Sequence, residues 1–223
     1  REDYLKRLDK LTYGDSASQG IQRGRMFYHR DLNMALTFPE GWHVENSPYA
    51  IVSWTTQKDA LVMVKKSALP SDNATSLESF LKSQAKLSAK FQGKPIPDVK
   101  LASVTGTDRM AGPFGTHETR VSAVHYGQNA YLFFGATKDP AALTRFDPDF
   151  IATAASLRPL KPAEKTVAEG QHLRLVRARA GDTFASLAKA SPLTEYSELT
   201  LRLINNMFPD GEPVAGEFIK IIK

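Results

Sequence analysis

Hydrophobic and polar residues alternate along the middle of the chain with the two-residue period of half-buried β-strands. A turn at Pro39-Glu40-Gly41 interrupts this pattern after its first run. Strands are expected at Met34–Phe38, Ala50–Thr55, Ala60–Lys65, Val99–Arg109, His117–Tyr126 and Ala130–Thr137. The pattern predicts a predominantly antiparallel sheet.

Two stretches have helical spacing instead. Thr75-Ser-Leu-Glu78 fits a capping box, and the apolar positions that follow it predict a helix to about Lys90. Later, Asp139-Pro140 and Asp147-Pro148 each place a capping carboxylate before a proline at the first helical position. The last helix is expected to end before Pro159. Together with the strands, these helices predict the α+β class.

The C-terminal part has its own pattern. A strand over Leu173–Arg179 leads into the turn Gly181-Asp182-Thr183, two short amphipathic helices follow, and a strand begins at Phe218 after Gly216. Glycine can adopt the positive φ of a sharp turn, and Asp182 or Thr183 can cap a helix that starts at Phe184. A small βααβ module is therefore expected.

Segments without a clear period divide the chain. Apolar spacing over 4–11 predicts a short helix that docks on the first domain, and Lys161–Gly170 is polar and lacks periodicity. The expected organisation is a connector over residues 1–25, an α+β domain over 26–160, a linker over 161–171 and the small domain over 172–223.

Composition narrows the functional classes. The net charge of +5 comes from 29 basic and 24 acidic residues without long runs, and residues 165–223 hold eight basic and seven acidic residues, so no nucleic-acid partner is expected. The absence of cysteine excludes disulfides, thiolate nucleophiles and cysteine zinc sites. The apolar run Ala130–Ala136 is too short to span a bilayer, so no transmembrane segment is expected. The start at Arg1, without Met or a signal-peptide profile, suggests a processed product or a part of a longer protein.

The turn Phe38-Pro-Glu-Gly-Trp42, the sheet, and a helix whose final turn is Ala155–Leu160 resemble the PsbP-like fold. The resemblance covers residues 26–160. It implies a sheet packed between helices and a binding or assembly role.

The small module resembles a LysM domain, a glycan-binding module, at the Gly-Asp-Thr turn, at Leu201 to Asn205 and at Gly216 to Ile221. It departs from that pattern at Glu217, where Gln is usual, and in a long loop over 208–213. The resemblance implies a shallow sugar groove, whose residues here would be Gly181, Asp182, Thr183, Phe184, Asn205, Met207 and Phe208. The same residues also hold such a fold together, so glycan binding and a purely structural role both stay open.

The N-terminal stretch over residues 4–42 looks like the region that follows the catalytic core in bacterial HtpX-like zinc metallopeptidases, some of which end in a PsbP-like and a LysM-like domain. Their catalytic motif, His-Glu-x-x-His, is absent; His117-Glu118 lies in an expected strand, where neighbouring side chains point to opposite faces. No catalytic residue, metal ligand or cofactor is therefore assigned to this chain, and zinc is expected only in an upstream catalytic domain.

These resemblances imply a non-catalytic accessory or targeting region of an envelope-associated, periplasmic zinc metallopeptidase. It would position the protease on peptidoglycan or on a protein partner, the protease core included. The alternative is a stand-alone peptidoglycan-binding or protein-interaction module without a protease.

Overall fold

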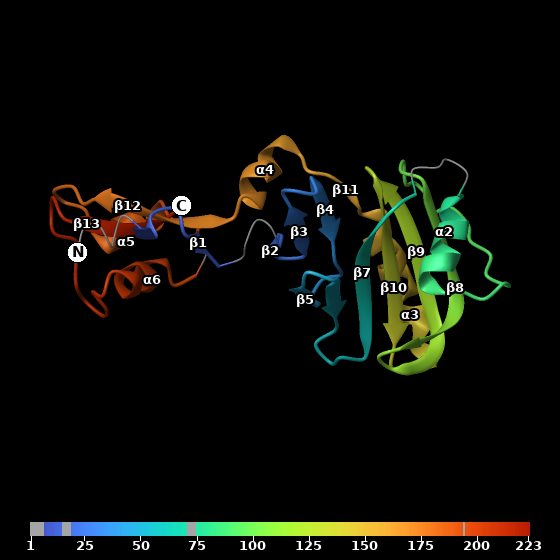
Figure 1. Cartoon of the computed structure of the whole chain (residues 1–223). Coiled ribbons are helices and arrows are strands. Elements are labelled where there is room, and N and C mark those ends of the chain that lie inside the picture. The colour runs from blue at the N-terminus through green and yellow to red at the C-terminus, as the bar shows by residue number, and fades with distance from the viewer. Residues whose placement is uncertain (1–6, 15–18, 71–74, 194) are drawn as a thin grey trace. The chain divides into compact units, whose positions relative to one another are not determined.

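The computed structural model describes residues 7–14, 19–70, 75–193 and 195–223. The chain divides into two compact units (Figure 1). The large unit is Ser18–Lys165, and the small unit combines Thr166–Lys223 with the start of the chain up to Ala17. The following paragraphs describe each unit by itself.

An antiparallel six-stranded sheet forms the centre of the large unit, in the order β5-β6-β7-β10-β9-β8. Its strands are β5 (His43–Asn46), β6 (Ile51–Trp54), β7 (Ala60–Ala68), β8 (Ser103–Gly112), β9 (Gly115–Tyr126) and β10 (Asn129–Thr137). The expected strands and their antiparallel pairing are confirmed. β7 and β10 pair over their whole length, from Asn129 opposite Ala68 to Thr137 opposite Ala60.

A second, four-stranded sheet has the order β11-β4-β3-β2. Its strands are β2 (Ile21–Arg23), β3 (Met26–His29), β4 (Met34–Thr37) and β11 (Arg158–Pro159). The hairpin of β2 and β3 crosses residue 25, the expected end of the connector, so that boundary is wrong. Arg158–Pro159 is extended and pairs with β4, where a last helical turn was expected.

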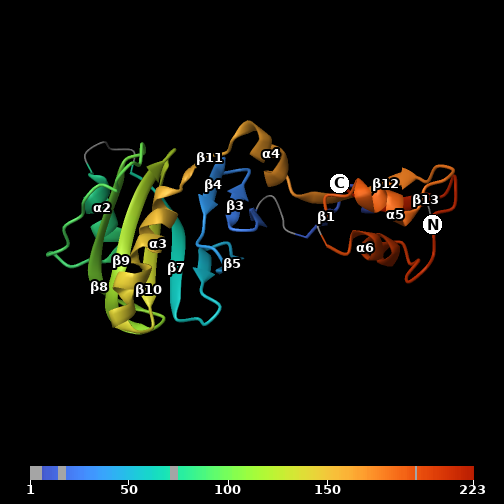
Figure 2. The same cartoon turned by 180° about the vertical axis from the view of Figure 1, so that it is seen from behind.

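Two helices cover opposite faces of the six-stranded sheet. α3 (Leu143–Ala155) packs on the face of Phe133, where Phe146 and Phe150 join the larger apolar core. α2 (Leu77–Ala85) packs on the face of Leu132. The alternation of Leu132 and Phe133 along β10 thus serves two cores. Figure 2 shows α3 on the near face of the sheet, and Figure 1 shows α2 there.

The ends of α2 differ from the prediction. The cap is Ser76, whose hydroxyl accepts a hydrogen bond from the Ser79 N–H at 3.1 Å, and not Thr75. The helix ends at Ala85 and does not reach Lys90, because Lys86 takes the left-handed conformation with φ 53°.

The two aspartate–proline pairs near α3 have different roles. Asp139 caps the short 3-10 helix η1 (Pro140–Ala142) by accepting from the Ala141 N–H at 3.0 Å, as expected. Asp147 lies inside α3 and caps nothing there; its two oxygens accept from Nε and an Nη of Arg120 on β9, at 2.6 Å each. The partly buried ion pair draws Asp147 away from the capping role that local sequence favours.

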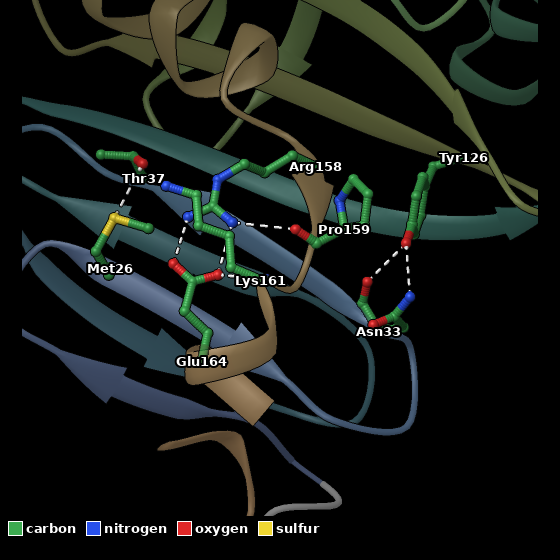
Figure 3. Close-up of polar contacts among 8 residues, drawn as sticks. All are labelled: Met26, Asn33, Thr37, Tyr126, Arg158, Pro159, Lys161 and Glu164. Atoms are coloured by element: carbon green, nitrogen blue, oxygen red, sulfur yellow. Dashed lines mark hydrogen bonds and ion pairs between the residues drawn. The ribbon is translucent and has the colours of Figure 1, made fainter. Parts of the chain in front are cut away.

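The segment expected to be an irregular linker is partly helical. α4 (Pro162–Ala168) begins where the Lys161 N–H donates to Glu164 at 2.8 Å. Glu164 also accepts two hydrogen bonds from Arg158 on β11, each 2.7 Å long (Figure 3). Because the fork of the guanidinium matches the carboxylate, this contact fixes the first turn of α4 to β11.

The small unit has the expected element order β12 (Gln171–Arg177), α5 (Phe184–Lys189), α6 (Ser197–Ile204) and β13 (Phe218–Ile222). A third strand joins its sheet in the order β1-β12-β13, where β1 is Thr12–Tyr13. The Lys10 N–H donates to the Leu173 carbonyl at 2.7 Å, and Asp9 accepts from the Leu175 N–H at 2.9 Å. The docking of this segment on the first domain is therefore a wrong prediction; residues 4–6 of the expected helix lie outside the described residues.

Candidate functional site

The turn before α5 has the geometry that its sequence predicts. Gly181 has φ 86°, a conformation that favours glycine. Asp182 accepts from the Arg179 N–H at 2.8 Å, which closes the turn. Thr183 caps α5, because its hydroxyl accepts a hydrogen bond from the Ser186 N–H at 3.1 Å. In return, the Thr183 N–H donates to the Ser186 hydroxyl at 3.0 Å. The polar groups of the turn thus stabilise the start of the helix.

Phe184 lies inside the small unit. Its side chain is completely buried, so its ring fills the core and is not available at the surface. Its N–H points to the adjacent loop and donates to the Glu212 carboxylate at 2.7 Å. A carboxylate at this position also faces the positive end of α5.

Glu212 is a residue that the sequence prediction missed. The loop before it closes on itself, because the Gly211 N–H donates to the Met207 carbonyl at 2.7 Å. Arg202 on α6 binds the same carboxylate and donates to the Pro209 carbonyl at 2.8 Å. Through Glu212, the loop over 207–212 and the turn over 181–184 are neighbours, although 20 or more residues separate them in sequence.

The Arg202 side chain is the anchor of this loop. It is 12% exposed and also pairs with Glu198, one helical turn earlier, at 2.7 Å. Two carboxylates and one carbonyl therefore neutralise and bind a nearly buried guanidinium, while its Nε is buried without a hydrogen-bond partner. The spacing of Glu198 and Arg202 indicates their pairing on one helix face, but no local pattern points to Glu212.

Asn205 joins α6 to β13. Its side-chain amide donates to the Leu201 and Lys220 carbonyls and accepts from the Lys220 N–H, all at 2.8 Å. Burial lowers the pKa of the Lys220 ammonium, because the partly desolvated site disfavours its charged form. Both polar atoms of the Asn205 side-chain amide bond to backbone groups, so the residue clamps α6 to β13.

Met207 and Phe208 differ in accessibility. Met207 is half-buried, whereas Phe208 is 58% exposed. Of the seven candidate groove residues, Phe184 and Asn205 are used inside the fold, whereas Phe208 is a large apolar side chain at the surface. The Phe184 N–H contacts Glu212, and the Met207 carbonyl closes the loop that carries Glu212. On the turn, Asp182 is half-buried and Thr183 is exposed.

The aromatic residues of the large unit mostly serve the core. Trp42 packs edge-on against Phe146 and Phe150, with ring centroids 5.9 and 6.2 Å apart, and Phe133 is buried between the sheet and α3. A stacking platform formed by these rings is therefore closed to a ligand.

The described part of the chain holds no group of three or more His, Cys, Asp or Glu residues placed to bind a metal. The His125 ring contacts the Gly127 carbonyl at 3.0 Å, and the His117 ring lies 3.5 Å from the Thr137 carbonyl. Within the same described ranges, no helix is both long and apolar enough to cross a membrane.

Comparison with models of protein families gave no match for the sequence. No curated protein proved similar to it.

The solved structures that align with this one include the following two. A crystal structure of a protein from Bacteroides thetaiotaomicron aligns with a TM-score of 0.45 and 11% identity over 85% of this chain; the chain spans 64% of that protein. The solution structure of cyanobacterial PsbP from Synechocystis aligns with a TM-score of 0.44 and 14% identity over 63% of this chain and 95% of that one. The second of these structures carries the PsbP name, and the α+β description of this chain rests on its own strands and helices.

Proposed function

We propose that the chain is a non-catalytic binding region, in which the small unit docks on peptidoglycan and thereby positions an attached zinc metallopeptidase in the bacterial envelope. The observation that carries the proposal is the contact of Phe184 N–H with Glu212, at 2.7 Å. It sets the turn over 181–184 beside the loop over 207–212, as a glycan groove of the LysM kind requires.

Phe208 is the side chain that we assign to sugar contact. It is 58% exposed on a loop that Arg202 and Glu212 hold, so its ring is presented without a large cost of ordering on binding. Exposed aromatic rings supply apolar area to the face of a sugar, and the carboxylates and hydroxyls at the rim supply hydrogen bonds.

Sedimentation with insoluble peptidoglycan tests this assignment. Residues 1–223 are expected to sediment with it, and Phe208→Ala is expected to stay in solution while retaining its fold. Tyr196→Ala is the matched control, because Tyr196 is also an exposed aromatic residue of the small unit but lies outside the groove. Wild-type protein that is folded and remains in the supernatant would remove glycan from the proposal.

A specific feature supports a second candidate, a protein partner. Tyr196, Leu199 and Leu203 are exposed and follow each other at helical spacing on and before α6. If Tyr196→Ala loses capture of a protein while Phe208→Ala retains it, the small unit is a protein-interaction module. This candidate includes the stand-alone module without a protease.

The non-catalytic assignment has its own test. Residues 1–223 are expected not to hydrolyse casein with or without added zinc. Hydrolysis that depends on zinc and stops with a chelator would overturn it.

A further inference from the structure

A pocket of about 470 Å³ opens in the large unit, and none of the groove residues discussed above lines it. Its floor comes from Val64 and Lys66 on β7 and Tyr131 on β10, and the turns after β3 and β5 form its walls. Pockets of a few hundred Å³ suit small molecules. The site therefore has the size of a ligand site.

The register of the sheet explains why these three residues share the floor. Tyr131 lies directly opposite Lys66, and Phe133 lies opposite Val64. Opposite residues of an antiparallel pair point to the same face, so Lys66, Val64 and Tyr131 all point to the face of the larger core. The pocket is the open end of that core, where the packed side chains stop.

Tyr131 has the most unusual environment in the pocket. Tyr131 is 3% exposed, and its hydroxyl has no hydrogen-bond partner among the described residues. Burial raises the pKa of Tyr131 to about 12, so the hydroxyl keeps its proton and is a donor at neutral pH. The hydroxyl oxygen is not among the buried polar atoms that lack a partner, so it is accessible from the pocket and can donate to a bound acceptor.

Lys66 supplies a positive charge to the lining of the pocket. It is exposed and makes no ion pair with any described acidic residue. The acidic lining residue, Asp31, is already paired with Arg30 at 2.9 Å. The charge that is free to meet a ligand here is therefore positive.

Apolar side chains form much of the lining, among them Leu32, Met34, Ile51 and Val64, and the uncharged or titratable polar residues Gln19, His29, Asn46 and Ser47 also line it. A ligand that fills the pocket must therefore have an apolar body. Its polar group has to accept from Tyr131 and attract Lys66, which a carboxylate does and an amine does not.

Both walls are fixed by hydrogen bonds. The Tyr126 hydroxyl donates to the Asn33 carbonyl at 2.6 Å, which holds the turn after β3 (Figure 3). In the turn after β5, Ser47 donates its hydroxyl to the Ala50 carbonyl at 2.9 Å and accepts from the Ala50 N–H at 3.2 Å. A pocket with fixed walls loses little entropy when a ligand enters.

We infer that this pocket binds a small amphipathic carboxylate, with the carboxylate between Tyr131 and Lys66 and the apolar body over Val64 and Ile51. The site is independent of the groove in the small unit, and it gives the large unit a ligand of its own.

The test is an NMR titration of residues 1–223 with decanoate. Amide shifts are expected in residues 46–51, 64–66 and 129–131. Decanol, which has the same chain without the charge, and acetate, which has the charge without the chain, are each expected to bind at least about tenfold more weakly.

Two variants test the polar contacts, and an otherwise unperturbed amide spectrum shows that each variant is folded. Lys66→Glu and Tyr131→Phe are each expected to weaken decanoate binding about tenfold. Lys65→Glu is the matched control, since it makes the same charge change on the opposite face of β7 and is expected to bind as the wild type does. Shifts confined to other residues, equal binding of decanol, or unchanged affinity in either variant would overturn the inference.

Discussion

Substitution of Asn205 distinguishes a structural role of this residue from a role in glycan binding. In the structure its amide makes three hydrogen bonds of 2.8 Å, two of them to the backbone of Lys220 on β13 and one to the Leu201 carbonyl. Asn205→Ala removes all three and leaves the Lys220 N–H and carbonyl without these partners. The Leu201 carbonyl keeps the hydrogen bond from the Asn205 N–H, at 3.3 Å.

The expected loss of folding free energy follows from these contacts. A net value of about 1 kcal/mol for each hydrogen bond gives a total of about 3 kcal/mol, and the partner that Leu201 retains reduces it to about 2–3 kcal/mol. An equilibrium shift of this size corresponds to a roughly 30- to 150-fold rise in the opening of the small unit.

Hydrogen exchange read by mass spectrometry measures that opening in each unit separately. Peptides from β12, α6 and β13 are expected to exchange faster by this factor in Asn205→Ala, while those from β8, β9 and β10 serve as the internal reference and stay unchanged. Asn206→Gly is the control, because the neighbouring Asn206 has φ 60° and glycine is favoured in that conformation. An Asn205→Ala variant with wild-type exchange that no longer binds peptidoglycan would refute the clamp and restore Asn205 as a ligand residue.

Two further predictions concern the contacts that fix α4 and the N-terminal segment. Arg158 lowers the pKa of Glu164 to about 2 from an ordinary 4.5, so Glu164→Gln is expected to destabilise the large unit above pH 4.5, by no more than about 3 kcal/mol from the shift and by about 1 kcal/mol after allowance for the hydration of the pair. Because a depressed carboxyl pKa stabilises the folded state only while the group is ionised, the difference from the wild type should fade as pH falls from 4.5 towards 2; urea unfolding across this range measures it, and a difference that does not change with pH would contradict the reasoning. Asp9→Ala leaves the Leu175 N–H unpaired and is expected to raise hydrogen exchange in β12 roughly 5- to 30-fold, for a loss of about 1–2 kcal/mol. Asp9→Asn retains an acceptor oxygen and should restore most of the protection; equal exchange in wild type and Asp9→Ala would show that the segment does not stabilise this sheet.

The strands of the large unit could be predicted from sequence because their alternation is regular and their cores lie on both faces. β7, β9 and β10 differ from their expected limits only by a few residues. The cap of α2 moved by one position because Thr75 and Ser76 are both good capping residues, and the choice between them depends on packing.

The failures share a physical cause, which is contact between residues far apart in sequence. Asp147 follows the pattern of a cap but pairs with Arg120, 27 residues away. The pairing of Thr12 with His172 has no local signal at all. Backbone pairing between such distant segments depends on the complete fold.

In the candidate groove, the features that depend on neighbouring residues could be predicted, whereas the contacts between distant segments could not. The cap at Thr183 and the turn that Asp182 closes follow from residue type and spacing. Glu212, which joins the turn to the loop, lies 28 residues from its partner Phe184. The burial of Phe184 and the exposure of Phe208 likewise become visible only when both segments are in place.

The central claim is that the small unit binds glycan through the turn and loop that Glu212 joins, and NMR titration with soluble peptidoglycan fragments tests it most directly. The account predicts amide shifts in residues 181–184 and 207–213, with Phe208→Ala weakening binding about tenfold and Tyr196→Ala leaving it unchanged. A folded wild-type chain that shows no shifts in these residues, or a Phe208→Ala variant that binds with wild-type affinity, would contradict it.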